Sequence, residues 1–231
     1  MRYDRIIQNY GQYCPIAKAA EVLGDRWTLL ILRDMHTGAL HFNELHRGLP
    51  GISRSVLTQR LRQLERDDLI ERLLDERNKT TGYALTAAGN DLAFVLSALT
   101  DWVNRWVMED PTPAELDPRL LLLWFSRVVD PASFGEGRFV AEFQMSGPMP
   151  GRSWIVVDKG EVSLCLDDPC LEIDLWVEAD TAALYQVFMG RQLLKSAVAQ
   201  DLVNINGTPG VIRAFLQTVD QTKMPYMIEA S

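Results

Sequence analysis

The sequence predicts an α+β protein in two parts, a mostly helical part closed by a β-hairpin and a part built around an antiparallel sheet. Apolar residues recur at helical spacing through the first hundred of the 231 residues. Strands that alternate apolar and polar side chains follow between residues 138 and 177. Residues 1–109 carry 14 cationic and 14 acidic side chains, so the whole net charge of −8 lies in residues 110–231. We therefore expect two domains, 1–109 and 110–231.

The composition also narrows the protein class. A hydrophobic fraction of 47% with 23% charged residues is ordinary for a globular protein that folds around a core. The N-terminus has no apolar stretch typical of a signal peptide, and the longest apolar runs are too short for a membrane span. Three cysteines cannot all pair within one chain, which favours free thiols in a reducing cytoplasm. The acidic second half is not expected to bind DNA or an anionic membrane.

Three helices are expected to open the chain. Pro15 suits a helix N-terminus, and apolar residues at helical spacing follow it up to residue 23. Asp25 can cap a second helix over residues 26–35. A third, short helix is expected around residues 42–47, before a Pro-Gly turn.

The fourth expected helix, residues 54–67, has two distinct faces and can be capped by Ser53. At roughly 100° per residue, Leu57, Leu61 and Leu64 form a narrow apolar stripe. The opposite side and its flank have hydrogen-bond donors and no carboxylate, and consist of Ser55, Thr58, Gln59, Arg62 and Arg66. Such a face suits the major groove of DNA, although the helix taken alone equally fits any amphipathic surface helix.

A short hairpin is expected directly after this helix. Residues 70–74 and 81–85 are predicted as strands, and the turn between them is polar and carries two cations. A helix pair followed by such a hairpin is the layout of a winged helix-turn-helix, in which the hairpin tip reaches the DNA backbone or minor groove. The residues expected to contact DNA are Asn43, Ser53, Arg54, Ser55, Thr58, Gln59, Arg62, Arg77, Asn78 and Lys79.

The surface expected to face DNA has a positive local charge. Between residues 36 and 64 four arginines, Arg60 among them, stand against Glu44 alone, which gives 4 − 1 = +3. The domain as a whole is neutral, but the electrostatic attraction of DNA depends on this face.

A long helix over residues 87–108 ends the first domain and has more apolar surface than a small winged helix can bury. We interpret its stripe as a homodimer interface, because paired operator half-sites require a two-fold protein. The alternative is packing within the same chain. The stripe consists of Leu92, Val95, Leu96, Leu99, Trp102, Val103 and Trp106.

Residues from about 11 to 107 resemble the HxlR family of winged-helix regulators. The matching segments, in the family's order and spacing, are CPIA at 14–17, GDRWTLLILR at 24–33, FNEL at 42–45, PGIS at 50–53, LTQRL at 57–61, LIER at 69–72 and YALT at 83–86, with Gly89. The resemblance implies a dimeric DNA-binding repressor or activator. Asp68 departs from the pattern, because the family often has glycine there.

The second half is expected to hold a small antiparallel sheet with helices on one face. An extended linker at 110–113 precedes an apolar helix over 116–129. The expected strands are residues 138–145, 154–158, 161–166, 171–177 and 202–206, and Lys159-Gly160 forms a hairpin turn. Helices are expected from Thr181, over 193–199 and over 211–218.

This order resembles the sterol-carrier-protein type 2 (SCP-2-like) domain over residues from about 120 to 220. The traits are WIVVD at 154–158, a Gly160 turn, ADT at 179–181, FMG at 188–190 and VNINGTP at 203–209. The resemblance implies an apolar cavity that binds a hydrophobic small-molecule effector. The same residues could also fill an ordinary core. The expected lining is Trp154, Val156, Leu164, Leu175, Val177, Leu184, Phe188 and Leu194, with Tyr185, Gln192 and Lys195 as possible polar groups.

Few residues point to other chemistry. Cys14 precedes a helix N-terminus, which can activate a thiol for redox sensing, although the role of a small buried core residue is the favoured alternative. The three histidines recur every five residues and share no helical face, so no metal site and no cofactor is expected. We find no phosphate-binding loop, dinucleotide fingerprint or nucleophile elbow, and therefore expect no enzyme.

Two functional hypotheses remain. The first is a ligand-responsive regulator that binds a palindromic DNA operator as a homodimer, away from membranes. The second is a lipid-binding or protein-interaction module in which the winged helix is only a scaffold. Salt-dependent binding to a duplex would distinguish them.

Overall fold

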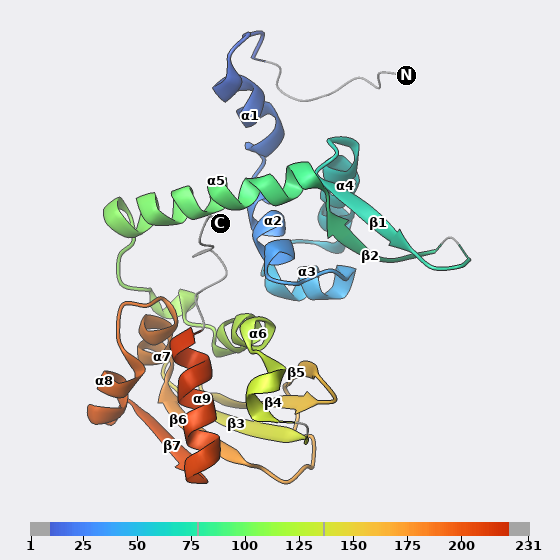
Figure 1. Ribbon diagram of the computed structural model, residues 1–231. Helices are drawn as coiled ribbons and strands as arrows, with labels where there is room; N and C mark the ends of the chain where they lie inside the picture. The colour runs from blue at the N-terminus through green and yellow to red at the C-terminus, as the bar shows by residue number, and fades with distance from the viewer. Residues whose placement is uncertain (1–9, 78, 136, 222–231) are drawn as a thin grey trace. The chain divides into compact units, whose positions relative to one another are not determined.

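The computed structural model describes residues 10–77, 79–135 and 137–221, except for the side chains of residues 220 and 221 (Figure 1). The chain divides into two compact units, Met1–Leu96 and Ser97–Ser231. This division falls inside helix α5, Ala87–Trp106, so the domain boundary expected after residue 109 stays a prediction. Within the described residues, no helix is long and apolar enough to cross a membrane.

The first unit has the helices and the hairpin that the sequence predicted. Leucine and isoleucine side chains from its helices form one core, in which Ile31, Leu45, Leu57 and Leu61 are at most 1% exposed. Leu96 from the long last helix closes this core. The elements are α1 Pro15–Leu23, α2 Thr28–His36, α3 Phe42–Gly48, α4 Arg54–Arg66, β1 Ile70–Leu74, β2 Thr80–Leu85 and α5 Ala87–Trp106.

The turn between α4 and β1 explains the residue that departs from the family pattern. Asp68 has a φ of 58°, in the left-handed region that glycine adopts at least cost and that Asp tolerates better than most residues. Its carbonyl accepts the Thr86 hydroxyl at 2.6 Å. A Cβ added at Gly89 would lie 2.1 Å from the carbonyl oxygen of Leu69, so only glycine lets α5 approach this turn so closely.

The second unit contains a five-stranded sheet of order β5-β4-β3-β6-β7. The prediction of an antiparallel sheet is wrong for one pair, because β3 and β6 run parallel. The first three strands form a meander, and the chain then returns along the sheet before β6 begins beside β3. The elements are η1 Pro113–Glu115, α6 Pro118–Val128, η2 Pro131–Phe134, β3 Phe139–Ser146, β4 Gly151–Asp158, β5 Glu161–Cys165, β6 Leu175–Asp180, α7 Thr181–Phe188, α8 Leu194–Ala199, β7 Val203–Gly207 and α9 Pro209–Gln221.

The connection from β5 to β6 replaces part of a predicted strand. Residues 171–174 are not in a strand, although Leu171 and Ile173 alternate as strand residues do. Both side chains pack on β3 and β4, against Val140, Trp154 and Val156. The alternating pattern therefore spans two segments. Residues 171–174 pack alternate side chains on the surface of the sheet, whereas β6, from Leu175 on, is a strand within the sheet.

Helices cover one face of the sheet. Helices α6, α7, α8 and α9 bury one face and form the main core with the aromatic side chains of Phe125, Phe143, Phe188 and Phe215 (Figure 1). Phe125 packs edge-on against each of the other three, with ring centroids 5.6–6.2 Å apart.

The hairpin turn at Lys159-Gly160 is confirmed, since both residues have the positive φ that a two-residue turn requires.

Candidate nucleic-acid interface

Helix α4 presents its predicted polar face to solvent. The hydroxyl of Ser53 accepts the N–H of Val56 at 3.2 Å and caps the helix, as the sequence predicted. Leu57, Leu61 and Leu64 are buried on one side. The exposed residues on the other side are Ser55, Gln59, Arg62 and Arg66. Together with Arg54, which is exposed in the first turn, we call them the outer face of α4; Thr58 lies half-buried on its flank. The hydroxyl of Thr58 donates to the carbonyl of Arg54 at 2.8 Å.

The arginines of α4 differ in their partners. Arg60 forms an ion pair with Asp25 at 2.6 Å, and both side chains are about two-thirds buried. The positive charge expected at residues 36–64 is therefore reduced, because Asp25 outside that range neutralises Arg60. Arg54 lies over the ring of Phe42, and its Nη2 donates to Oδ1 of Asn43 at 3.0 Å. Neither of these contacts neutralises its charge.

A carboxylate that the sequence analysis did not single out binds the backbone of two residues at the hairpin tip. Oδ1 of Asp75 accepts the backbone N–H groups of Arg77 at 2.9 Å and Lys79 at 2.8 Å. Both cationic residues are exposed, as expected of a tip that meets DNA. Asp75 and Glu76 balance their charge, so the tip is polar with no net charge. Asn78, also expected to contact DNA, lies outside the described residues.

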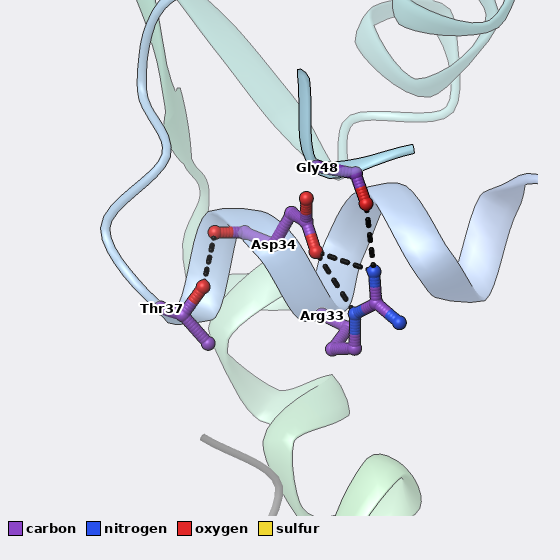
Figure 2. A network of polar contacts seen from close by, with 4 residues as sticks. All are labelled: Arg33, Asp34, Thr37 and Gly48. Atoms are coloured by element: carbon purple, nitrogen blue, oxygen red, sulfur yellow. Dashed lines mark hydrogen bonds and ion pairs between the residues drawn. The ribbon is translucent and has the colours of Figure 1, made fainter. Parts of the chain in front are cut away.

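A buried ion pair within α2 also contacts the end of α3 (Figure 2). Asp34 is 0% exposed, and its Oδ1 accepts Nε of Arg33 at 2.9 Å and Nη2 at 2.7 Å. The same Nη2 also donates to the carbonyl oxygen of Gly48 at 3.4 Å. The hydroxyl of Thr37 donates to the backbone carbonyl of Asp34 at 2.9 Å. The network holds together the helices that support α4. Sequence reasoning missed it, although an acidic residue among the apolar residues of α2 was the signal.

The apolar stripe of α5 is only partly used by its own chain. Leu96 is 8% exposed and Leu92 packs on the core of the first unit, so these two residues are core residues in a single copy. Val103 is half-buried. The members that remain exposed are Val95 at 40%, Leu99 at 41%, Trp102 at 56% and Trp106 at 71%. Phe94, which was not predicted, is 53% exposed on another side of the helix.

Cys14 lies directly before α1 and is partly exposed. Hydrogen bonding from the backbone N–H groups of Ala17 and Ile16 lowers the pKa of its thiol, because these donors stabilise the thiolate. Cys165 is also partly exposed, and Cys170 is exposed.

The three histidines have separate surroundings. A ring nitrogen of His36 contacts the carbonyl of Gly89, and one of His41 contacts the carbonyl of Thr81. His46 stacks on Phe42. Within the part of the chain that the structure describes, no three histidine, cysteine or acidic side chains gather as metal ligands would.

The core of the second unit contains a void of about 10 Å³, roughly the volume that one water molecule requires. Of the predicted pocket residues, Leu184 and Phe188 line it, and Leu175, Val177 and Leu194 belong to the same core, against which Leu164 packs. Placing Trp154 and Val156 between sheet and helices was wrong. They alternate with Ile155 and Val157 along β4, so they point to the opposite face.

Comparison with known proteins places the first half of the chain. Residues 22–111 match the family model described as HxlR-like helix-turn-helix. An uncharacterized HTH-type transcriptional regulator, YvaP of Bacillus subtilis, is 33% identical over 106 residues, which are 45% of this chain and 96% of YvaP. The HTH-type transcriptional regulator YodB of the same species is 32% identical over 104 residues, 44% of this chain and 93% of YodB. The crystal structure of quinone-bound YodB covers 40% of this chain and 99% of its own, at 31% identity and a TM-score of 0.36.

Proposed function

The chain belongs to the HxlR-like helix-turn-helix family, and on that premise we propose that its transcriptional-regulator function depends on α4 reading a DNA operator through its outer face. The observation that carries the proposal is this face itself. It is exposed, rich in hydrogen-bond donors and without a carboxylate, on a helix whose other side is anchored in the core. Side chains of these types recognise base edges and phosphates in the major groove.

The hairpin supports the same assignment. Arg77 and Lys79 are exposed at the tip, and Asp75 accepts a hydrogen bond from the backbone N–H of each, which suits contact with phosphates or the minor groove. We propose that the tip orients the protein on DNA, while Gln59 and Arg62 read bases. Ser53, Ser55 and Thr58 are placed to support these contacts from the N-terminal half of α4.

Gln59→Ala and Arg62→Ala are each expected to weaken specific DNA binding by about 1–3 kcal/mol, as for the loss of one good base contact. The probe is a labelled duplex that the wild-type protein selects from a random-sequence library, and fluorescence anisotropy measures the affinity. Arg213→Ala, which removes an exposed arginine from α9, is the matched control and should bind like wild type. Affinity within twofold of wild type for both α4 variants would refute the assignment.

We further propose that two copies pair through α5 to read a palindromic operator. The exposed stripe of Val95, Leu99, Trp102 and Trp106 supports this, because large apolar side chains in a row are costly to leave in water. A two-fold pair would present two α4 helices to successive half-sites.

For the second unit we propose an SCP-2-like role as the sensor of a hydrophobic effector. The segments that carry the resemblance form consecutive elements, since 154–158 lies in β4, Gly160 in the following turn, Thr181 begins α7 and Gly207 ends β7. The void beside α7 is lined by apolar residues alone. Because it holds about one water, a ligand must displace the aromatic side chains around it, as in a pocket that opens on binding.

An effector that binds the folded form is expected to raise the melting temperature as its concentration increases. At a concentration one hundred times Kd, it should raise the free energy of unfolding by about 2.7 kcal/mol. The measurement is a melting screen of fatty acids and other apolar compounds with the full chain. Phe188→Ala enlarges the void that Phe188 lines, so it should lower stability and bind smaller compounds better. If no compound shifts the melting of either protein, the effector proposal fails and the unit is a protein-contact module.

The lowered pKa of Cys14 favours a second candidate, a thiol-based redox response. A lower pKa means that the reactive thiolate persists to lower pH than in the unfolded chain. We expect iodoacetamide to alkylate Cys14 half-maximally at a lower pH in the folded protein than in urea, as followed by peptide mass spectrometry. Identical pH profiles in the two states would remove the basis for this candidate.

A further inference from the structure

Arg54, in the first turn of α4, is held in place by two side chains of α3. The guanidinium carbon lies 4.9 Å from the centroid of the Phe42 ring, and Nη2 donates to Oδ1 of Asn43 at 3.0 Å. The Phe42 ring is itself stacked on the imidazole of His46, with centroids 6.4 Å apart and planes 10° from parallel. These contacts restrict an exposed arginine, which would otherwise lose considerable side-chain entropy on binding a ligand.

The two contacts leave most of the hydrogen-bonding capacity of this site free. The hydrogen bond to Asn43 takes one of the five N–H groups of the guanidinium, and the contact with the Phe42 ring involves no acceptor oxygen. Because Oδ1 of Asn43 accepts this bond, its Nδ2 amide group stays available as a donor. Two neighbouring donor groups, one of them charged, suit an anion that only accepts hydrogen bonds, and a phosphate is such an anion.

Arg60 on the same helix shows the contrast. Its guanidinium is paired with the Asp25 carboxylate, so its charge is neutralised within the protein. Arg54 is oriented by an aromatic ring and an amide, neither of which carries a charge. The protein thus fixes the direction of Arg54 and keeps its positive charge for a partner.

We propose that Phe42 is a positioning residue for DNA binding, which orients Arg54 so that Arg54 and Asn43 together bind one phosphate of the DNA backbone. The inference rests on the proposed function of α4. It separates the roles of α4 residues, because Arg54 contributes affinity for any duplex, whereas Gln59 and Arg62 contribute preference among sequences.

The test measures affinity against salt concentration for the selected duplex and for an unrelated duplex of the same length. Arg54→Ala should weaken binding to both by about tenfold or more and reduce the salt slope by about one unit. Phe42→Leu keeps an apolar side chain but removes the ring, and should weaken both by about two- to fivefold. Phe42→Tyr keeps the ring and should bind like wild type. In an Arg54→Ala background, Phe42→Leu should have no further effect.

Other results overturn the inference. If Phe42→Leu weakens binding equally with or without Arg54, the ring acts through the fold, and a matching loss of melting temperature would identify that cause. Wild-type affinity for Phe42→Leu would also overturn it. A change in sequence preference for Arg54→Ala would show base reading in place of phosphate binding. If the wild-type protein selects no duplex at all, the proposed function fails, and this inference fails with it.

Discussion

Replacing Asp34 with alanine is expected to lower the free energy of unfolding by about 3–5 kcal/mol, the cost of breaking a buried ion pair from one side. Asp34 is fully buried and accepts two hydrogen bonds from Arg33, whose side chain is 17% exposed. Without the carboxylate, a largely buried guanidinium would lose the two charge-assisted hydrogen bonds that it donates to Asp34. Urea unfolding followed by circular dichroism measures the change.

An exposed ion pair of the same length provides the control. Arg72 and Glu65 lie 2.7 Å apart, but their side chains are 37% and 35% exposed. Solvent screens such a pair, so Glu65→Ala should change stability by about 1 kcal/mol or less. The double variant Arg33→Met, Asp34→Leu should recover much of the stability lost in Asp34→Ala, because apolar side chains replace both members of the buried pair. A loss of less than about 1 kcal/mol for Asp34→Ala would contradict this account.

Local periodicity predicted the first unit well, for a physical reason. A helix in contact with one core must repeat its apolar residues with the helical period, so Leu57, Leu61 and Leu64 identified both the buried side of α4 and the polar side opposite. Asp68 was also identified as unusual from the family pattern, and its positive φ explains why glycine is common there.

Contacts between residues distant in sequence could not be predicted in the same way. Nothing in the sequence around Arg60 indicates that Asp25 neutralises it, since the pair forms only when α4 packs beside the turn between α1 and α2. The parallel pairing of β3 with β6 likewise depends on the path of the intervening chain. Trp154 and Val156 alternate like residues that face helices, but a strand buried on both sides has apolar residues on both faces, so periodicity does not tell which face is which.

Trp102→Glu is expected to convert the proposed dimer into monomers and to weaken binding to the selected palindromic duplex by about a hundredfold or more. Trp102 is 56% exposed in the single chain and lies on the same stripe of α5 as Leu99 and Trp106. Large aromatic side chains of this kind contribute most of the binding energy of protein interfaces, and a buried unpaired carboxylate opposes association. A monomer offers one α4 to one half-site, so the gain from linking two half-sites is lost.

Phe94→Glu is the matched control, because Phe94 is 53% exposed on the same helix but lies well away from the stripe at roughly 100° per residue. Sedimentation velocity should show a dimer for wild type and Phe94→Glu, and a monomer for Trp102→Glu. Circular dichroism should show all three proteins folded, because Trp102 and Phe94 are surface residues of a single copy. A dimer for Trp102→Glu, or dissociation caused by Phe94→Glu alone, would place the interface elsewhere and leave the apolar stripe of α5 without its proposed partner.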